Sequence, residues 1–338
     1  MPEQAQSNSS VHIEYVRPAS WKQILAHFID FFIFVVTFLL MFLGLRGIAS
    51  VTSAYKNATA LMNEIQLDSG LYMEYNERPV DVVSYYDSNA ESYTAKEITS
   101  VYEKTMSTFI AYVGSHSSVD NQKIVQDNYD QYRLNLKFSD GKNYFITHDD
   151  QVVYNLECTA TYDDYNKSVY SPYISNQAKS YLSTLFPEYL EATRLISNTL
   201  LFVEVPVAVI LAGILVYFVP PLIFARGRRT IGMLVYKIGR VGQDVYSLRL
   251  GRFIAESAIF IFGILALSLV TLGVPLIISF SMLIFSKKKQ DFPDYMLGIE
   301  TLDLTSSKIY FNRQEIEQEY FFTERKAVDF QMENRLDK

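Results

Sequence analysis

The stretch ILAHFIDFFIFVVTFLLMFLGL, residues 24–45, decides the fold class of this chain. It is apolar over the length of about 20 residues that a helix needs to cross the hydrocarbon core of a bilayer. It is longer than the apolar part of a typical signal peptide, and no small-residue cleavage pattern follows it. It nevertheless contains His27 and Asp30. Because a carboxylate in a bilayer is costly unless it faces the protein interior and has a partner, we expect a retained membrane helix with an interior polar contact.

Two further apolar runs, residues 200–224 and 254–285, predict additional membrane segments. The first of these fits one span. The second is long for a single span and is interrupted by TLGVP at residues 271–275. Because Gly and Pro break or kink helices, this run is either one kinked, tilted span or a hairpin of two short arms.

The distribution of basic residues predicts the orientation of these segments. The loop at residues 225–252 contains seven Lys or Arg and one acid, Asp244. Basic connecting loops stay in the cytoplasm, so this loop and the N-terminus are expected inside, and the segment between the first two spans outside. Lys287, Lys288 and Lys289 follow the third run. The same rule keeps them inside, which favours the hairpin over one span.

The sequence thus predicts an α-helical polytopic membrane protein with three or four membrane segments and an inserted α+β extracytoplasmic domain. We expect it in a bacterial plasma membrane as a multi-pass protein with both termini cytoplasmic. The expected segments are a cytoplasmic N-terminus (1–23), a first membrane helix (24–45), the extracytoplasmic domain (46–198), a second membrane helix (199–224), the basic cytoplasmic loop (225–252), a third helix or a hairpin broken near 271–275 (253–286), and a cytoplasmic tail (287–338).

The segment 46–198 is acidic and rich in tyrosine. It holds twelve Lys or Arg against twenty Asp or Glu, hence 12 − 20 = −8, and 18 of the 25 Tyr. About 150 residues suffice for one domain with its own core. We interpret the tyrosines as core and edge residues and the acids as solubilising. The alternative is a surface that binds cations, a cell-wall polymer or a partner protein, although no loop has the spacing of a calcium site.

The order of elements in this segment follows from its periodicity. A capping box of Ser88 and Glu91 predicts the start of a helix that ends near Gly114. Alternating apolar and polar residues around an Asp-Gly turn predict three antiparallel strands over 131–161. A final helix over 174–197 is expected to lead into the second span.

Three short motifs around the membrane segments carry a resemblance to a known family. WKQILAHFIDFFIF supplies Trp21, Ala26, Ile29 and Asp30, with Lys22 at the position of an expected Arg. RGRRTIGMLVYKIGRVGQDVYSLRLGRFIAE supplies Thr230, Gly232, Gly242 and Arg252. QDFPDYMLGIETL supplies Asp294 and Gly298, with Pro293 in the place of a common His and Asp291 as a rival for the acidic position.

Together these motifs resemble the RDD family of small polytopic membrane proteins, which is named after one Arg and two Asp. The resemblance covers about 17–46 and 200–302, and the segment between them looks like an insertion. Members of the family are described as transporters, and sodium/proton antiport has been attributed to some. The resemblance therefore implies transport of a small cation or a proton. Lys22 keeps the charge of the expected Arg but lacks its bidentate fork.

The candidate site is a polar cluster near the cytoplasmic side of the bilayer. Asp30 lies about six residues inside the first span, or roughly 9 Å deep at 1.5 Å per residue. In a functional interpretation, Asp30 exchanges a proton or a small cation with the help of Arg252 and Asp294, and His27 modulates it. In a structural interpretation, Asp30 pairs permanently with Arg252 or Arg226 and fixes the helix assembly. Both interpretations remain open, and the further candidates are Lys22 and the interfacial His27.

Two classes of function follow from the sequence. The first is a transporter or cation/proton antiporter; three or four spans are few for a carrier, so this predicts a homo-oligomer or a partner membrane protein in the lipid bilayer. The second is a non-transport, membrane-anchored sensor, binding or assembly protein whose external domain carries the function. No nucleophile motif, phosphate loop or metal-protease signature is present in the sequence. We therefore expect no enzyme, catalytic residue, cofactor, resident metal or nucleic-acid partner.

Overall fold

The computed structural model describes residues 16–322, which form two compact units. The first consists of the chain up to Gly47 together with the chain from Leu201 onward, and the second is Ile48–Leu200. The outer parts of the two predicted cytoplasmic ends, residues 1–15 and 323–338, lie outside the described residues. Each unit is described by itself.

Three helices are long and apolar enough to cross a membrane among the described residues: Ser20–Val51, Pro187–Ile223 and Leu250–Val270. This confirms the prediction of a helical membrane protein at the level of length and composition. A fourth apolar helix, Val274–Phe285, is shorter. Each of the three helices begins before its predicted span, in less apolar sequence, and the first also continues past the predicted end at residue 45.

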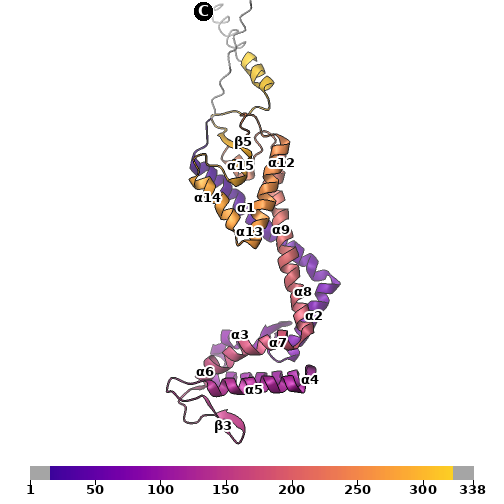
Figure 1. Ribbon diagram of the computed structural model, residues 1–338, viewed down its shortest axis with the longest axis vertical. Coiled ribbons are helices and arrows are strands. Elements are labelled where there is room, and N and C mark those ends of the chain that lie inside the picture. The colour runs from indigo at the N-terminus through magenta and orange to yellow at the C-terminus, as the bar shows by residue number, and fades with distance from the viewer. Residues whose placement is uncertain (1–15, 323–338) are drawn as a thin grey trace, which may run out of the picture. The chain divides into compact units, whose positions relative to one another are not determined.

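The first unit is built mainly of helices, with one small sheet (Figure 1). Its elements are α1 (Ser20–Val51), the π-helix η4 (Thr199–Glu204, which enters from the second unit), α9 (Val205–Gly213), the π-helix η5 (Ile214–Phe218), α10 (Val219–Ile223), α11 (Ile231–Val235), β5 (Ile238–Val241), α12 (Leu250–Ala258), the π-helix η6 (Ile259–Ala266), α13 (Leu267–Val270), α14 (Val274–Phe285), α15 (Phe292–Leu297) and β6 (Glu300–Asp303). Residues 313–322 are also helical.

The third apolar run is broken where Gly and Pro predicted it. Helix α13 ends at Val270, Gly273 has a φ of +85°, and α14 starts at Val274. Gly is suited to this left-handed conformation because it has no Cβ. Helix α14 then packs back against η6 (Figure 1). The run therefore forms two arms joined by a tight turn.

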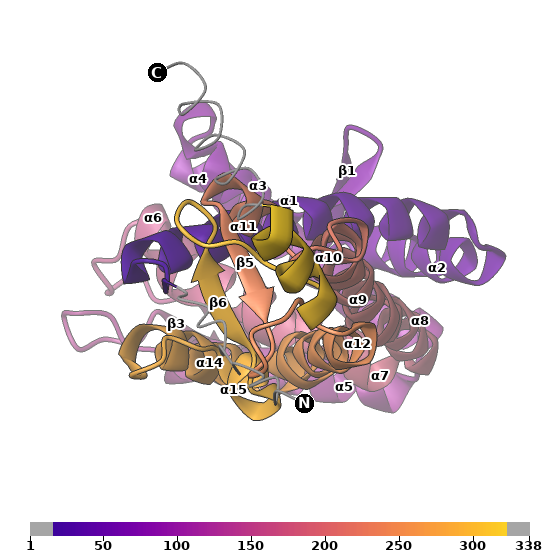
Figure 2. The same cartoon turned by 90° about the horizontal axis from the view of Figure 1, so that it is seen from above.

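A two-stranded antiparallel sheet joins the basic loop to the end of the first unit. Strands β5 and β6 pair so that Arg240 lies opposite Thr301, and Figure 2 shows the two strands side by side. The start of α1 is fixed to this sheet, because Gln23 donates a side-chain hydrogen bond to Thr301 (2.5 Å) and Lys22 forms an ion pair with Asp303 (2.7 Å). The sheet thus positions the basic loop, residues 225–252, next to the N-terminal part of α1 that contains Asp30.

Close packing of small and large residues holds the long helices of this unit together. Phe34 of α1, Ala212 of α9 and Leu265 of η6 belong to one buried cluster. A Cβ at Gly213 would lie 3.2 Å from Leu265, so a small residue at this position lets α9 approach η6 closely. Such packing, rather than the hydrophobic effect, drives helix association in lipid.

The second unit has its own core and its own small strands. Its elements are α2 (Ser53–Asp68), β1 (Tyr72–Tyr75), β2 (Arg78–Asp81), α3 (Val82–Ser88), the 3₁₀-helix η1 (Ala90–Ser92), α4 (Ala95–His116), α5 (Val119–Asn135), β3 (Phe145–His148), β4 (Gln151–Tyr154), α6 (Tyr162–Tyr165), the π-helices η2 (Asn166–Tyr170) and η3 (Tyr173–Ala178), α7 (Lys179–Leu185) and α8 (Pro187–Asn198). Tyr102, Tyr170 and Tyr173 are fully buried in its core.

Two expectations for the second unit are wrong in detail, and the predicted final helix over 174–197 is interrupted at Phe186, whose backbone is extended. The predicted three strands over 131–161 are replaced by the end of α5, a single bridge between Lys137 and Asn143 around the Asp-Gly turn, and the hairpin β3–β4. The capping box forms at Thr94 and Glu97 instead of Ser88 and Glu91. Alternation alone does not separate a strand from the last turns of an amphipathic helix, which explains the first error.

Candidate functional site

Both carboxylate oxygens of Asp30 accept hydrogen bonds from the start of α11. Thr230 Oγ1 donates to one oxygen at 2.5 Å, and the backbone N–H of Gly232 donates to the other at 2.7 Å. Thr230 is also the N-cap of α11, because its side chain accepts from Met233 N. Asp30 has no exposed surface. The carboxylate therefore joins α1 to the basic loop through a helix N-terminus, where backbone N–H groups favour negative charge.

The contact requires glycine at position 232. A Cβ at Gly232 would lie 2.0 Å from the carbonyl oxygen of Ala26 and 3.0 Å from Asp30 Cγ. Real Cβ atoms do not approach a backbone oxygen this closely. The Thr230-Ile231-Gly232 segment thus supplies a hydroxyl donor, an amide donor and the space that the first helix needs.

A buried ion pair lies next to this contact. Arg240 of β5 bonds through Nη1 to Oε1 of Glu256 on α12 at 2.9 Å, and both side chains are less than a tenth exposed. Its Nε donates to the carbonyl oxygen of Arg228 at 2.8 Å, whereas Nη2 is buried without a hydrogen-bond partner among residues 16–322. Burial alone would lower the pKa of Arg240, but the nearby carboxylates of Glu256, Asp294 and Asp291 raise it above its usual value. Arg240 is therefore the positive centre of the site.

Two further buried acids come from α15. Asp291 is the N-cap of this helix and accepts a hydrogen bond from Asp294 N at 2.9 Å. Asp294 Oδ1 is buried without a hydrogen-bond partner in the described part of the chain. Burial raises the pKa of Asp291 above its usual value, although the Asp294 N–H and the charge of Arg240 limit the rise. Burial and the adjacent Asp291 raise the pKa of Asp294 well above its usual value. Asp294 is thus the acid whose environment most favours a bound proton.

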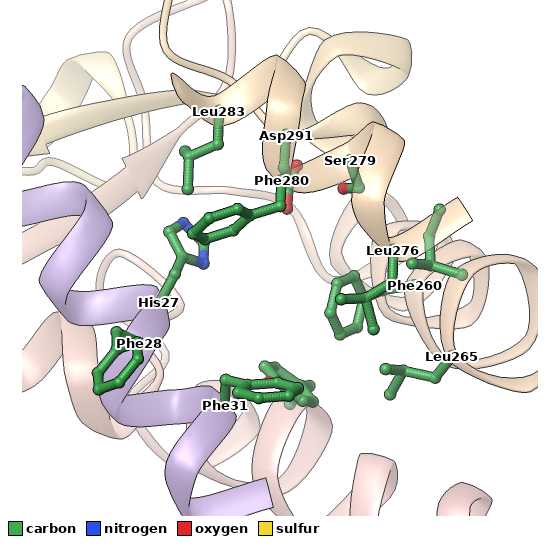
Figure 3. A pocket seen from close by; sticks show the side chains of 12 residues that line it. His27, Phe28, Phe31, Phe260, Leu265, Leu276, Ser279, Phe280, Leu283 and Asp291 are labelled. Carbon is green, nitrogen blue, oxygen red and sulfur yellow. The ribbon is translucent and has the colours of Figure 1, made fainter. Parts of the chain in front are cut away.

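These groups surround two adjoining cavities. The smaller, of about 20 Å³, is lined by His27, Thr230, Arg240, Glu256, Asp291 and Asp294, among others. It has room for about one water molecule. The larger, of about 270 Å³, is mostly apolar and shares His27, Tyr217, Phe260 and Asp291 with the smaller one. Figure 3 shows the side chains that line the larger cavity, with His27 on α1 and Asp291 near Ser279.

The buried carboxylates outnumber the buried cations in this cluster. Asp30, Glu256, Asp291 and Asp294 are each at most 9% exposed, and Arg240 is 3% exposed. If all were ionised, four negative charges would face one positive charge, an excess of three. Buried charge without compensation is strongly unfavourable and is relieved by protonation or by a bound cation. The arrangement can therefore hold protons or a single positively charged group, but within the described part of the chain no three His, Cys, Asp or Glu side chains are grouped so that they could hold a metal ion together.

The structure brings together only part of the predicted site. His27, Asp30 and Asp294 belong to the buried polar cluster, as described above. Lys22 pairs with Asp303, and Arg226 pairs with Glu315 at 2.5 Å near the end of the described chain. Arg252 lies on the exposed face of α12, with its guanidinium next to Gly242. Neither Arg226 nor Arg252 bonds to Asp30, which is held by Thr230 and Gly232 instead.

The main residue of the site that the sequence did not single out is Arg240, the partner of Glu256. Arg240 is one of seven basic residues in the loop, and no local pattern distinguishes it from the others. It is buried because β5 pairs with β6, which is distant in sequence. Thr230 and Gly232 did carry a signal, since they belong to the Thr-x-Gly motif of the family resemblance, but their contact with Asp30 requires the folded loop.

Comparisons with known proteins give no match: no family model fits the chain, and no curated protein or solved structure is significantly similar to it. The RDD resemblance therefore remains a prediction from short motifs.

Proposed function

We propose that the protein is an RDD-type membrane carrier that exchanges protons for a small cation at the buried cluster of Asp30, Arg240, Glu256, Asp291 and Asp294. The observation that carries this proposal is the excess of buried carboxylates over buried cations. Such an excess requires positive charge from outside the protein, and protons and cations compete for the same carboxylates. Intramembrane and near-membrane acids of this kind typically mark ion pathways.

The acids have different roles in this proposal. Asp30 has a structural role and connects α1 to the basic loop, because both of its oxygens already accept short hydrogen bonds from Thr230 and Gly232. Asp294 carries the exchangeable proton, since its free oxygen borders the small cavity and its pKa is raised, first by burial and then by Asp291. Arg240 holds Glu256 and limits the negative potential.

The proposed topology follows the basic loop. Both termini and the β5–β6 sheet lie in the cytoplasm of a plasma membrane, residues 46–198 lie outside, and the two arms around Gly273 form a hairpin that returns to the cytoplasmic side. Because three long helices and one short arm are few for a carrier, the active form is a homo-oligomer.

Proton flux tests the proposal directly. The full-length chain is reconstituted into liposomes that contain a pH-sensitive dye, and a gradient of Na⁺ or K⁺ is imposed. We expect the wild type to move protons against the cation, and Asp294→Asn to reduce this flux about a hundredfold or more, the lower end of the typical contribution of a positioned proton-transfer group. Asp244→Asn is the matched control because Asp244 is a half-exposed acid of the same chain, outside the cluster.

A second function is favoured by the independent core of the second unit. Residues 48–200 form a compact unit whose buried cluster is separate from those of the helical unit. This organisation also suits a membrane-anchored sensor, binding or assembly protein. If the well-folded wild type shows no cation-dependent proton flux with Na⁺, K⁺ or Li⁺, the carrier proposal fails and this second function gains support.

A further inference from the structure

The larger cavity of the helical unit has one polar end and otherwise apolar walls. It measures about 270 Å³. Phe28 and Phe31 of α1 and Leu276 and Phe280 of α14 form much of its wall (Figure 3). The volume is nearly twice the ~150 Å³ of an engineered apolar cavity that holds benzene. The cavity thus has room for an apolar group of about two fused rings.

The polar end is formed by His27, Ser279 and Asp291 (Figure 3). Asp291 caps α15 through Asp294 N, and within the described part of the chain it forms no ion pair with a basic side chain within 4.0 Å. Asp291 also lines the small cavity that contains Arg240, Glu256 and Asp294. The apolar cavity therefore shares Asp291 with the side of the cluster where positive charge is missing.

We infer that this cavity binds an amphipathic amine, with its apolar part between α1 and α14 and its ammonium group at Asp291. A small inorganic cation would leave the apolar volume empty, and a neutral apolar molecule would leave the carboxylates uncompensated. A ligand with an ammonium group and an apolar part would fill the apolar volume and compensate the carboxylates. The inference rests on the proposed function only in that both treat the buried acids as a site for positive charge; the binding of the amine itself does not require transport.

The surroundings of the cavity indicate how such a ligand enters. Phe28 and Phe31 of α1 are 60% and 42% exposed, and Phe280 of α14 is 40% exposed. Helix α1 is long enough to cross a membrane, and α14 is a shorter apolar helix, so lipid can contact these side chains. A lipophilic amine concentrates in the bilayer, where its ammonium group stays near the head groups. The cavity is therefore reached laterally from the membrane.

The test uses a fluorescent two-ring amine, 2-(1-naphthyl)ethylamine, and its neutral analogue 2-(1-naphthyl)ethanol. Binding to the full-length protein in lipid nanodiscs is measured by naphthalene anisotropy, with empty nanodiscs subtracted. We expect the amine to bind about tenfold or more tightly than the alcohol, which is the size expected of a charge-assisted hydrogen bond. Asp291→Asn should remove this difference while it preserves the helix cap, because Asn is as good an N-cap as Asp.

A second pair of variants tests the location. Leu276→Trp fills the cavity and should abolish binding of both probes, whereas Ile277→Trp, on a 62% exposed position of the same helix, should leave binding unchanged. Equal affinity for amine and alcohol would mean that the cavity holds only an apolar filler such as a lipid chain, and would overturn the inference. The inference is also wrong if Asp291→Asn or Leu276→Trp has no effect on amine binding.

Failure of this inference and failure of the carrier proposal are distinguishable. Proton exchange against Na⁺ or K⁺ without amine binding would overturn the inference and leave the carrier function in place. Selective amine binding that depends on Asp291, in a protein without any proton flux, would support the binding site and overturn the carrier function.

Discussion

The backbone N–H of Gly232 donates a hydrogen bond to Asp30 Oδ1 at 2.7 Å, across 202 residues of sequence. This bond, with the one from Thr230, anchors the basic loop to the first membrane helix. It gives the buried carboxylate of α1 a partner that is neither an arginine nor a ligand but the N-terminus of a short helix.

Gly232→Ala should destabilise the helical unit. The added methyl would lie 2.0 Å from the carbonyl oxygen of Ala26, so α11 and α1 must separate. We expect a loss of about 1–3 kcal/mol or more, as for overpacking in a core. Thermal unfolding in detergent measures the effect. Gly251→Ala is the matched control, because nothing lies within 4 Å of a Cβ there, and it should be neutral or slightly stabilising.

Asp30→Ala should be more damaging than Asp30→Asn. Alanine leaves the buried Gly232 N–H and Thr230 hydroxyl without an acceptor, at a cost of about 1–3 kcal/mol for each unsatisfied group. The amide oxygen of asparagine still accepts one of the two bonds. The fraction of monodisperse protein after purification and the melting temperature check this order. Equal melting temperatures for the two variants would contradict the structural role of Asp30 in connecting α1 to the basic loop.

Removal of Arg240 should cost more than joint removal of Arg240 and Glu256. Arg240→Met leaves the buried Glu256 carboxylate without its partner at 2.9 Å, and breaking a buried pair costs about 3–5 kcal/mol. In the double variant Arg240→Met/Glu256→Leu, no unpaired charge from this pair remains. Thermal unfolding of the wild type, both single variants and the double variant gives the coupling energy. A double variant less stable than Arg240→Met would contradict the prediction.

Asp294 should make the protein less stable as the pH rises. Its pKa is raised in the folded state, mainly by burial, so the folded chain binds more protons than the unfolded chain above the usual Asp pKa of about 3.9. Its favourable contribution is thus fully present below that pH and is lost as the pH rises through the folded pKa.

Melting curves between pH 5 and pH 9 test this dependence. Asp294→Asn should reduce the decline in melting temperature relative to the wild type. The other groups around the cluster also titrate or carry charge: His27 and Asp30 from α1, Tyr217 from η5, Arg240 from β5, Glu256 from α12 and Asp291 from α15. A slope unchanged by Asp294→Asn would assign the dependence to those groups.

The native thiol reports on topology. Cys158, in the second unit, is partly exposed and is the only cysteine of the chain. We expect a membrane-impermeant maleimide to label it in intact cells or spheroplasts. In a Cys158→Ser background, Gln314→Cys, at an exposed position, should react only after permeabilisation. Labelling of Gln314→Cys in intact cells would reverse the proposed orientation.

Much of the helical unit is predictable from the sequence, whereas the second unit is less so. The membrane helices follow from long apolar runs, and the break at Gly273 follows from residues that are poor helix formers. The hairpin β3–β4 turns through Asp149 and Asp150, both with positive φ, and β1–β2 turns through Asn76 and Glu77 in the same way. Neither pair is the favoured Asn-Gly or Asp-Gly, so the sequence at these turns does not strongly predict a hairpin.

The sequence by itself determined that this protein has membrane-length helices, that the third apolar run breaks, and that Asp30 needs an interior partner. Only the tertiary structure decided that the partner is the Thr230–Gly232 segment and that Arg240, rather than Arg226 or Arg252, is the buried cation. The physical reason is that apolar length and helix-breaking residues act locally. Burial of one arginine among seven basic residues depends instead on the pairing of β5 with β6, which lie far apart in the chain.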